Sequence, residues 1–393
     1  MSYDLLVIGG GIAGATLAGV MAREGAKVLV AERTSTFSDR VRGEALIPWG
    51  VEEARRLGIY QHLADTCGTT VRWWSTPQNR RDLFATTPSG NGFLDFYHPT
   101  MQQSLLDFAA ASGADVRRPV DVIQVVPGEI PSALIRSGGV ERTVFARLIV
   151  AADGRASRMR TIGGFALQRD PPCTVIAGVL HRNLAIADDA VEVFLNPGQQ
   201  ELEIFFPLGA NRFRSYFARR HDRRVRLSGA ADVYAFVQCC VASGAPAEWF
   251  DAAEVIGPLA SYDGADSWVP HPYCNGIGLI GDAAAASDPT YGCGLALSLR
   301  DVRVLRDHLL ADDDWRRAAD AYAEEHDRYY SDIHEVHDWW RTLFFDIGPE
   351  ADTARERALP KIGEDPSRIP DFIGLGPDTP HDEAVRRRFF GED

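Results

Sequence analysis

Lysine is almost missing from this chain. Lys27 and Lys361 are the two lysines among 393 residues, so nearly all of the 41 basic residues are arginine, and 55 acidic residues bring the net charge to −14. A chain with this acidic balance is poorly suited to the phosphate backbone of DNA or RNA. We therefore expect no nucleic-acid partner.

Long apolar runs and metal-type cysteine spacings are also missing. No window approaches the roughly 20 unbroken apolar residues of a membrane helix. The first apolar run follows Asp4 and has no basic flank, unlike an export signal. The six cysteines form no Cys-x-x-Cys pair, which argues against zinc. We expect a cytoplasmic protein with reduced, mostly buried thiols, no bound metal and no membrane span.

A dinucleotide-binding motif opens the chain. Residues 3–8 predict a buried parallel strand, Gly9-Gly-Gly11-Ile-Ala-Gly14 follows it, and the next residues have helical apolar spacing. A second predicted strand, 27–32, ends on Glu32. Glycines at this spacing let backbone amides approach a pyrophosphate at a helix amino terminus, and the acid accepts hydrogen bonds from a ribose. The acid favours FAD or NAD over a 2′-phosphorylated nucleotide.

Two later loops also contain glycine and aspartate and follow predicted strands. Asp153-Gly154 ends a predicted strand and leads into a turn of the form Asp-Gly-x-x-Ser-x-x-Arg. Gly281-Asp282 follows another strand, and the run from Asp288 through Pro289 and Gly292 to Gly294 precedes a helix. Either loop alone suits an ordinary turn, but the order of all three loops is much more specific. A second Gly-x-Gly-x-x-Gly match at 276–281 lies inside a predicted strand, so we reject it.

The hydrophobic periodicity predicts an α/β protein with two intertwined modules and C-terminal helices near 295–309 and 315–345. Short turns rich in Pro, Gly and Asn join strand-like runs in the middle of the chain, which indicates antiparallel hairpins. Prolines beyond residue 345 predict a mostly irregular tail. The expected parts are a Rossmann-type FAD-binding domain (1–68, 98–171 and 269–345), an inserted, mainly antiparallel β-sheet substrate domain (69–97 and 172–268), and the C-terminal tail (346–393).

In motif order, residues 3–310 resemble the class A flavoprotein monooxygenases, whose fold is typified by para-hydroxybenzoate hydroxylase. The resemblance implies FAD as resident cofactor and NAD(P)H as a visiting one. The residues it assigns to the cofactors are Gly9, Gly11, Gly14, Glu32, Arg33, Arg42, Gln102, Asp153, Gly154, Asp282, Pro289, Gly292 and Gly294. Gln102 departs from the family pattern, because members often have an arginine in the segment matching 98–106. Glutamine can hydrogen-bond but supplies no charge.

The resemblance also implies a reaction. NAD(P)H would reduce FAD, O2 would add at flavin C4a, and the hydroperoxide would give one oxygen atom to a small, aromatic or polycyclic substrate. The protein must then position the substrate and exclude water, so we name no catalytic side chain and need no metal. The arginine-rich composition is typical of a GC-rich genome, where such enzymes often serve secondary metabolism, including antibiotic biosynthesis.

For the substrate pocket we expect residues from the first third of the chain and from the antiparallel sheet, namely Leu46, Trp49, Phe206, Arg214 and Tyr216. Packing in the core or at the surface is the alternative for each of them. Arg214 would either neutralise an anionic substrate or point to solvent. His98 and His271 are weaker acid–base candidates, each at its ordinary pKa.

Three other functions remain open at this point. A flavin-dependent olefin reductase shares the layout, and the Arg42-Gly-Glu44 turn suits it equally well. A flavin halogenase needs a lysine in the substrate region, and neither Lys27 nor Lys361 is well placed for that. A non-catalytic flavoprotein would bind FAD without substrate-linked NAD(P)H oxidation. The sequence leaves open the substrate, the choice among hydroxylation, epoxidation and Baeyer–Villiger insertion, the preferred nicotinamide and the oligomeric state.

Overall fold

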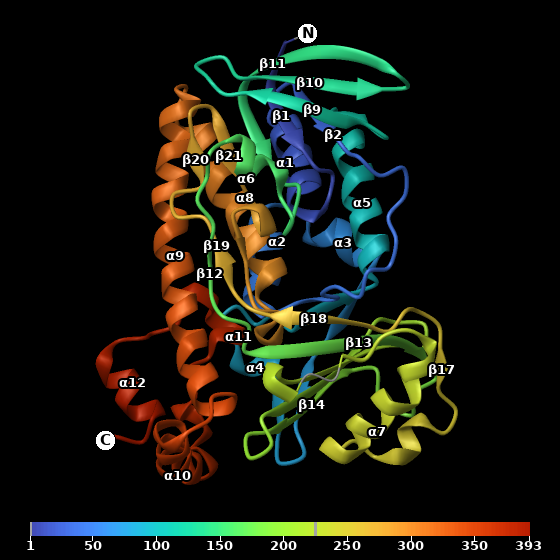
Figure 1. Ribbon diagram of the computed structural model, residues 1–393, viewed down its shortest axis with the longest axis vertical. Helices are drawn as coiled ribbons and strands as arrows, with labels where there is room; N and C mark the ends of the chain where they lie inside the picture. Colours follow the sequence, from blue (N-terminus) through green and yellow to red (C-terminus); the bar gives the residue numbers. More distant parts are fainter. Residues whose placement is uncertain (1, 224–225) are drawn as a thin grey trace.

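The computed structural model describes residues 2–223 and 226–393. Figure 1 shows two large sheets at different levels, with the long helix α9 (Trp315–Phe344) running along one side of the molecule. This mixed α/β architecture confirms the predicted fold class. The helices expected near 295–309 and 315–345 are also confirmed, as α8 (Gly294–Ala311) and α9.

The first sheet is the parallel one that the amino-terminal motif predicts. Its strand order is β20-β21-β11-β1-β2-β8, and the β9–β10 ribbon continues from β11. The bounds are β1 (Ser2–Ile8), β2 (Val28–Ala31), β8 (Asp115–Arg117), β9 (Asp121–Val126), β10 (Ser132–Ser137), β11 (Val140–Ala151), β20 (Tyr273–Cys274) and β21 (Ile277–Leu279). Strand β1 is parallel to β2 and β11, and β11 is parallel to β21. Their carboxyl ends therefore meet at one edge, where ligands of such sheets bind.

Helices pack on this sheet, whose central strands are apolar and buried over their carboxyl-terminal halves. Every residue of β2 is buried, as expected for a strand with both faces covered. Helix α1 packs against both α5 and α8. The bounds of the helices of this part are α1 (Ile12–Arg23), α2 (Pro48–Arg56), α3 (Tyr60–Thr66), α5 (His98–Ala111) and α6 (Arg158–Ile162).

The second sheet is mainly antiparallel and has two dissimilar faces. Its order is β17-β13-β16-β15-β14-β5-β6, with β18 paired to β13. The bounds are β5 (Trp73–Ser75), β6 (Arg80–Asp82), β13 (Thr174–Arg182), β14 (Ala190–Asn196), β15 (Glu201–Pro207), β16 (Arg212–Arg220), β17 (Glu254–Val255) and β18 (Ala260–Gly264). Side chains alternate between the faces. Phe205 and Phe217 pack toward α7 (Val233–Ser243), whereas Tyr216 belongs to the core shared with the first sheet.

Two small sheets complete the strand pairing. The sheet β3-β7-β4 joins Ala45–Leu46 (β3) to Phe93–Phe96 (β7) and Gly68–Val71 (β4). The sheet β12-β19-β22 joins Gln168–Arg169, Ser267–Trp268 and Ala285–Ala286. The first of these sheets holds the segment before Trp49 beside the second large sheet. Helix α4 (Leu83–Thr86) follows β6.

The expected irregular tail is wrong. Helices α10 (Pro349–Glu364), α11 (Phe372–Leu375) and α12 (Glu383–Phe389) form there, and Phe372, Phe389 and Phe390 join the main core. Pro349, Pro366 and Pro377 stand at the first positions of helical turns, where a missing backbone N–H has no consequence. These prolines therefore start helical turns rather than preventing them.

The expectation of mostly buried cysteines is also wrong. All six thiols are free, but Cys240 and Cys293 alone are buried, and Cys274 is exposed. The rejected 276–281 match leads into strand β21 and a short 3-10 turn rather than into an α-helix. Among the described residues, no helix combines the length and the hydropathy that crossing a bilayer requires.

Buried Glu203 should make the free energy of unfolding depend on pH. Its side chain is fully buried on β15, opposite Phe217, and burial raises its pKa to about 8. A carboxyl whose folded pKa exceeds its unfolded value of about 4.3 stabilises the fold at low pH and loses that contribution as pH rises through the folded pKa. The window for Glu203 therefore extends from about pH 4.3 to pH 8.

We expect Glu203→Gln to flatten this pH dependence. The difference in unfolding free energy between the variant and the wild type should favour the variant by about 3 kcal/mol more at pH 8 than at pH 5. Urea unfolding at both pH values measures it. Exposed Glu254, changed to Gln, is the control on β17, at the edge of the same sheet. A pH-independent difference for Glu203→Gln would show that this carboxyl does not titrate in the window.

Candidate cofactor and substrate site

The first glycine loop is built by close backbone approach. A Cβ on Gly14 would lie 2.0 Å from the carbonyl oxygen of Gly9, and one on Gly9 would lie 2.4 Å from the carbonyl oxygen of Ala152. Gly9 also has a φ of +103°, which favours glycine. At Gly11, by contrast, the nearest atom to an added Cβ is Gln102 Nε2, at 3.8 Å. The loop is tight inside and open on the side that faces Gln102.

Glu32 holds this loop through its carboxylate. Gly10 N donates to Glu32 Oε2 at 2.7 Å, and both the amide and the hydroxyl of Thr34 donate to Oε1 at 2.7 Å. The expected ribose-binding acid therefore lies at the first loop. Arg33, which follows it, is exposed.

The Asp153-Gly154 turn and the Asp282 loop are tied together. Asp153 Oδ2 accepts hydrogen bonds from Arg158 N and Met159 N, which orients helix α6. The other oxygen, Oδ1, is buried without a hydrogen-bond partner among the described residues. Arg160 Nη1 donates to the carbonyl oxygen of Asp282 at 3.3 Å. These two sequence-predicted loops therefore lie side by side.

The Arg42 segment reaches the same place from another direction. Arg42 Nη1 lies 3.9 Å from Asp282 Oδ2, and both side chains are partly exposed. His98 Nδ1 lies 2.7 Å from the carbonyl oxygen of Gly43. A Cβ on Gly43 would meet Leu295 Cδ1 at 3.3 Å, so the segment also borders the start of α8.

The last predicted loop ends at the start of α8. Asp288 Oδ1 accepts from Thr290 N at 2.8 Å, and Gly292 turns the chain with a φ of +69°. A Cβ on Gly294 would meet nothing within 4 Å. Helices α1 and α8 both begin without a side-chain cap within the described residues. Their free amides can therefore serve a ligand.

These observations fit a dinucleotide cofactor. At Gly11 and Gly294 there is open space that a side chain would occupy and that a cofactor can fill instead. The uncapped amino termini of α1 and α8 offer it amide donors and partial positive charge. Arg42 and Asp282 are placed to meet phosphate and sugar hydroxyls respectively. The binding roles of all the sequence-predicted residues remain predictions, but the structure brings their loops together.

Asp282 provides a direct test of this fit. Its carboxylate has Arg42 as an ion partner at 3.9 Å, so it remains available to hydroxyl donors. We expect Asp282→Ala to weaken FAD binding by about 1.5–3 kcal/mol, because it removes hydrogen bonds to a charged acceptor. Flavin titration by fluorescence measures this. Asp320→Ala, which removes an exposed partner of His271, is the control and should leave binding unchanged.

Arg214 contradicts the expectation that it meets solvent or an anionic substrate. Its side chain is fully buried. Arg214 Nη2 lies 2.8 Å from Asp39 Oδ2, and Nε lies 3.1 Å from Glu44 Oε1. Two carboxylates from the chain itself already balance its charge. Burial alone would lower its pKa, but these carboxylates and Tyr216 raise it overall.

The residues around Arg214 form a polar cluster that sequence reasoning missed. Tyr216 donates a hydrogen bond to Glu44, and burial raises the pKa of Glu44 to about 7 although Arg214 opposes the shift. Asp95 on β7 is fully buried, and burial together with nearby Glu44 raises its pKa well above its usual range. The available signal was that Glu44 lies two residues after the predicted Arg42. Nothing in the sequence indicated that Glu44 contacts residues of β16.

The other expected pocket residues are part of the main core or lie against it. Leu46, Trp49 and Tyr216 are buried in that core, and Phe206 packs against it. The ring of Phe206 lies 6.2 Å from that of Tyr216 and 6.4 Å from that of Phe93, with Trp74 stacked on Phe93. Phe93 also lines a pocket of about 250 Å³ between α2, α3 and β4.

The two histidine candidates differ in their surroundings. His98 begins α5 and contacts the Arg42 segment, and burial lowers its pKa, so the expectation of an ordinary pKa is wrong. His271 Nε2 lies 2.9 Å from the exposed carboxylate of Asp320 on α9. His98 thus joins the converging loops, whereas the contacts of His271 are on α9.

One cluster has the composition of a cation site. Asp170, Asp266 and His334 each place a ligand-type atom within 4.8 Å of the others. His334 Nε2 lies 2.8 Å from Asp170 Oδ2, and Asp266 Oδ1 accepts from Asp288 N at 3.0 Å. These hydrogen bonds account for the arrangement, and we place no metal there.

Comparison with known families identifies most of the chain. A family model described as "FAD binding domain" matches residues 2–336. The squalene epoxidase 1 of Arabidopsis thaliana is 25% identical over 326 residues, which make up 78% of this chain and 59% of that protein. The ubiquinone hydroxylase UbiL of Rhodospirillum rubrum is 27% identical over 339 residues, covering 78% and 72%. The chain thus spans about three fifths of the length of the plant relative.

Solved structures share the fold. The p-nitrophenol 4-monooxygenase PnpA from Pseudomonas putida DLL-E4 superimposes with a TM-score of 0.78 at 16% identity, over 97% of this chain and all of that one. A flavin-dependent brominase, Bmp2, gives a TM-score of 0.73 at 17% identity, over 95% and 94%. Identities this low establish a common fold and leave the reaction undecided.

Proposed function

The chain belongs to the FAD-binding domain family, and from that premise we propose that it is an NAD(P)H-dependent monooxygenase acting on a small molecule. The observation that carries the proposal is the convergence of the first glycine loop, the Arg42 segment, the Asp153 turn and the Asp282 loop. Of the two curated relatives reported above, one is named an epoxidase and the other a hydroxylase, and both names denote insertion of oxygen.

The proposed reaction balances with two co-reactants. Substrate, O2, NAD(P)H and a proton give the oxygenated substrate, NAD(P)+ and water. FAD, when bound, accepts two electrons from NAD(P)H and passes them to O2. Gly9, Gly11 and Gly14 would admit the pyrophosphate, and Glu32, Arg42 and Asp282 would hold the sugar and phosphate groups. The free amides at the start of α8 would stabilise negative charge on the reduced ring.

The substrate side would be apolar and aromatic. Leu46, Trp49, Phe206 and Tyr216 form its proposed wall, which favours an aromatic, polycyclic or isoprenoid molecule. Because Arg214 is already neutralised by Asp39 and Glu44, an anionic group on the substrate is not required. Exclusion of water by this wall would direct oxygen into the substrate rather than into peroxide.

Halogenation is the weaker reading of the same fold. Halogenases of related fold use a lysine in the substrate region, and the two lysines here lie elsewhere. Lys27 Nζ lies over the ring of Tyr3, 5.0 Å from its centroid. Lys361 Nζ is held by the carbonyl oxygens of Gly391 and Asp393 at 2.9 and 3.0 Å.

Isotope-labelled oxygen tests the proposal. We would supply the purified, FAD-loaded protein with NADH or NADPH, ¹⁸O2 and a panel of p-nitrophenol, squalene and ubiquinone. Consumption of nicotinamide with one ¹⁸O atom in the product supports a monooxygenase. A product that gains two hydrogens without O2 uptake supports the olefin reductase instead, and a protein that binds FAD but oxidises no nicotinamide with any substrate supports a non-catalytic flavoprotein.

A further inference from the structure

The segment from Asp371 to Asp378, which we call the clasp, lies beyond residue 336, where the family match ends. It consists of α11 and the turn Gly376–Asp378. Figure 1 shows α11 beside the lower part of α9, close to the second sheet. Its contacts reach α2, α8, β6 and the loop before α8.

The clasp packs directly against Trp49. A Cβ on Gly376 would lie 2.5 Å from the indole ring, and Gly376 has a φ of +58°. Both facts require glycine at this position. Trp49 is 4% exposed, and its indole Nε1 has no hydrogen-bond partner among the residues described. The clasp therefore fixes the ring of a residue that we place in the substrate wall.

The clasp also supports the loop that precedes α8. Phe372 meets Tyr291 edge-on, with ring centroids 6.5 Å apart. Tyr291 is in turn stacked on His337 of α9, at 4.3 Å and 14°. Burial lowers the pKa of His337 to about 3, so its ring is neutral at physiological pH. Tyr291 directly precedes Gly292, one of the residues that the family resemblance assigns to the cofactors.

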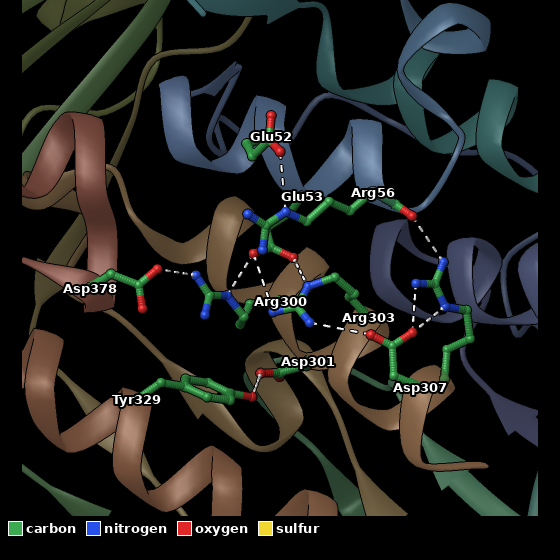
Figure 2. Close-up of polar contacts among 10 residues, drawn as sticks. Glu52, Glu53, Arg56, Arg300, Asp301, Arg303, Asp307, Tyr329 and Asp378 are labelled. Atoms are coloured by element: carbon green, nitrogen blue, oxygen red, sulfur yellow. Dashed lines mark hydrogen bonds and ion pairs between the residues drawn. The ribbon is translucent and has the colours of Figure 1, made fainter. Parts of the chain in front are cut away.

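An acidic residue at each end of the clasp forms an ion pair with an arginine elsewhere in the fold. Asp371 accepts two hydrogen bonds from Arg81 of β6, at 2.9 and 2.7 Å. Asp378 Oδ2 accepts from Arg300 Nη2 of α8 at 3.1 Å. Figure 2 shows that Arg300 also pairs with Glu53 of α2, which in turn pairs with Arg303. The clasp is thus joined to the second sheet at one end and to α2 and α8 at the other.

We propose that the clasp is a positioning element of the cofactor and substrate site: it holds Trp49 and Tyr291 in place and shields the flavin from solvent on that side. The proposal rests on the proposed function, because it needs a flavin between these residues. No clasp residue contacts the reacting atoms in this proposal; the clasp acts through Trp49 and Tyr291.

Two variants loosen the clasp without touching the dinucleotide loops. Gly376→Ala places a methyl group against the indole, and Gly363→Ala, on α10, is the matched control because its added Cβ meets nothing within 4 Å. Arg81→Gln removes the partner of Asp371. Its control is Arg80→Gln on the same strand, which removes an exposed pair with Asp189.

The readout is iodide quenching of the fluorescence of bound FAD, with FAD content and melting temperature measured on the same samples. We expect Gly376→Ala and Arg81→Gln to retain FAD and to be quenched severalfold more strongly than the wild type, while both controls match the wild type. Equal quenching at equal FAD content would overturn the clasp proposal alone. A wild-type protein that binds no FAD when reconstituted would overturn the proposed function and the clasp together.

Discussion

Replacing Arg214 by Met should destabilise the protein by about 3–5 kcal/mol, because it leaves two buried carboxylates without their cation. Asp39 and Glu44 are at most 9% exposed and both pair with Arg214. The loss should be larger at pH 8 than at pH 5. The pKa of Glu44 is already about 7, removal of Arg214 raises it further, and Glu44 can therefore be neutralised by a proton at pH 5. Urea unfolding at the two pH values measures both effects.

Two comparisons separate this effect from ordinary loss of an ion pair. Arg72→Met removes a half-exposed partner of Asp82 and should destabilise the protein much less than Arg214→Met does. Adding Glu44→Gln to Arg214→Met removes one of the stranded charges and should recover part of the stability. If Arg214→Met and Arg72→Met destabilise the protein equally, Arg214 is not required to balance the buried charges of Asp39 and Glu44.

Replacing Gly11 by Val should reduce FAD affinity about a hundredfold or more while the chain still folds. The added Cβ would have Gln102 Nε2 as its nearest neighbour, at 3.8 Å, so nothing within the protein resists it. The branched side chain would fill the space where a pyrophosphate approaches the free amides of α1, at the cost of two or more charge-assisted hydrogen bonds of about 1.5–3 kcal/mol each. FAD content after purification and equilibrium flavin titration measure it.

Gly363→Val is the matched control, because this glycine on α10 also has open space around its Cβ position. Both variants should melt within a few degrees of the wild type, since an added Cβ meets no atom closer than 3.8 Å at Gly11 and none within 4 Å at Gly363. Full FAD occupancy in Gly11→Val would remove the first glycine loop from the cofactor site, whatever the fold around it.

The sequence predicted the parallel sheet and its loops because those features are local. Apolar strands buried on both faces, a glycine run and an acid at the next strand end have short spacings, and β1, α1 and β2 form where the pattern placed them. The fold class and the family resemblance are confirmed by the structure and by the family match. The loops converge because parallel strands end at one edge of a sheet, which follows from topology alone.

The sequence could not predict contacts between distant segments. Nothing in the pattern of β16 indicates that Arg214 meets Asp39 and Glu44, since pairing across about 170 positions depends on how the second sheet docks. The prolines of the tail do not prevent helices there: Pro349, Pro366 and Pro377 stand at the first positions of helical turns, and α10 continues through Pro360. Tertiary burial of Phe372 and Phe389 then supports helices that are too short to persist alone.

The chain order of the clasp has a consequence for how the protein is made. A nascent chain leaves the ribosome amino terminus first, so Trp49, Tyr291 and Arg300 emerge before residues 371–378 are synthesised. If the clasp shields the flavin as proposed, the prosthetic group would enter while that side of the molecule is still uncovered, and the last helices would dock over it afterwards. We therefore expect two different rates of FAD uptake. Finished apoprotein from cells starved of riboflavin should take up FAD more slowly than the chain does during its synthesis in cells supplied with the vitamin.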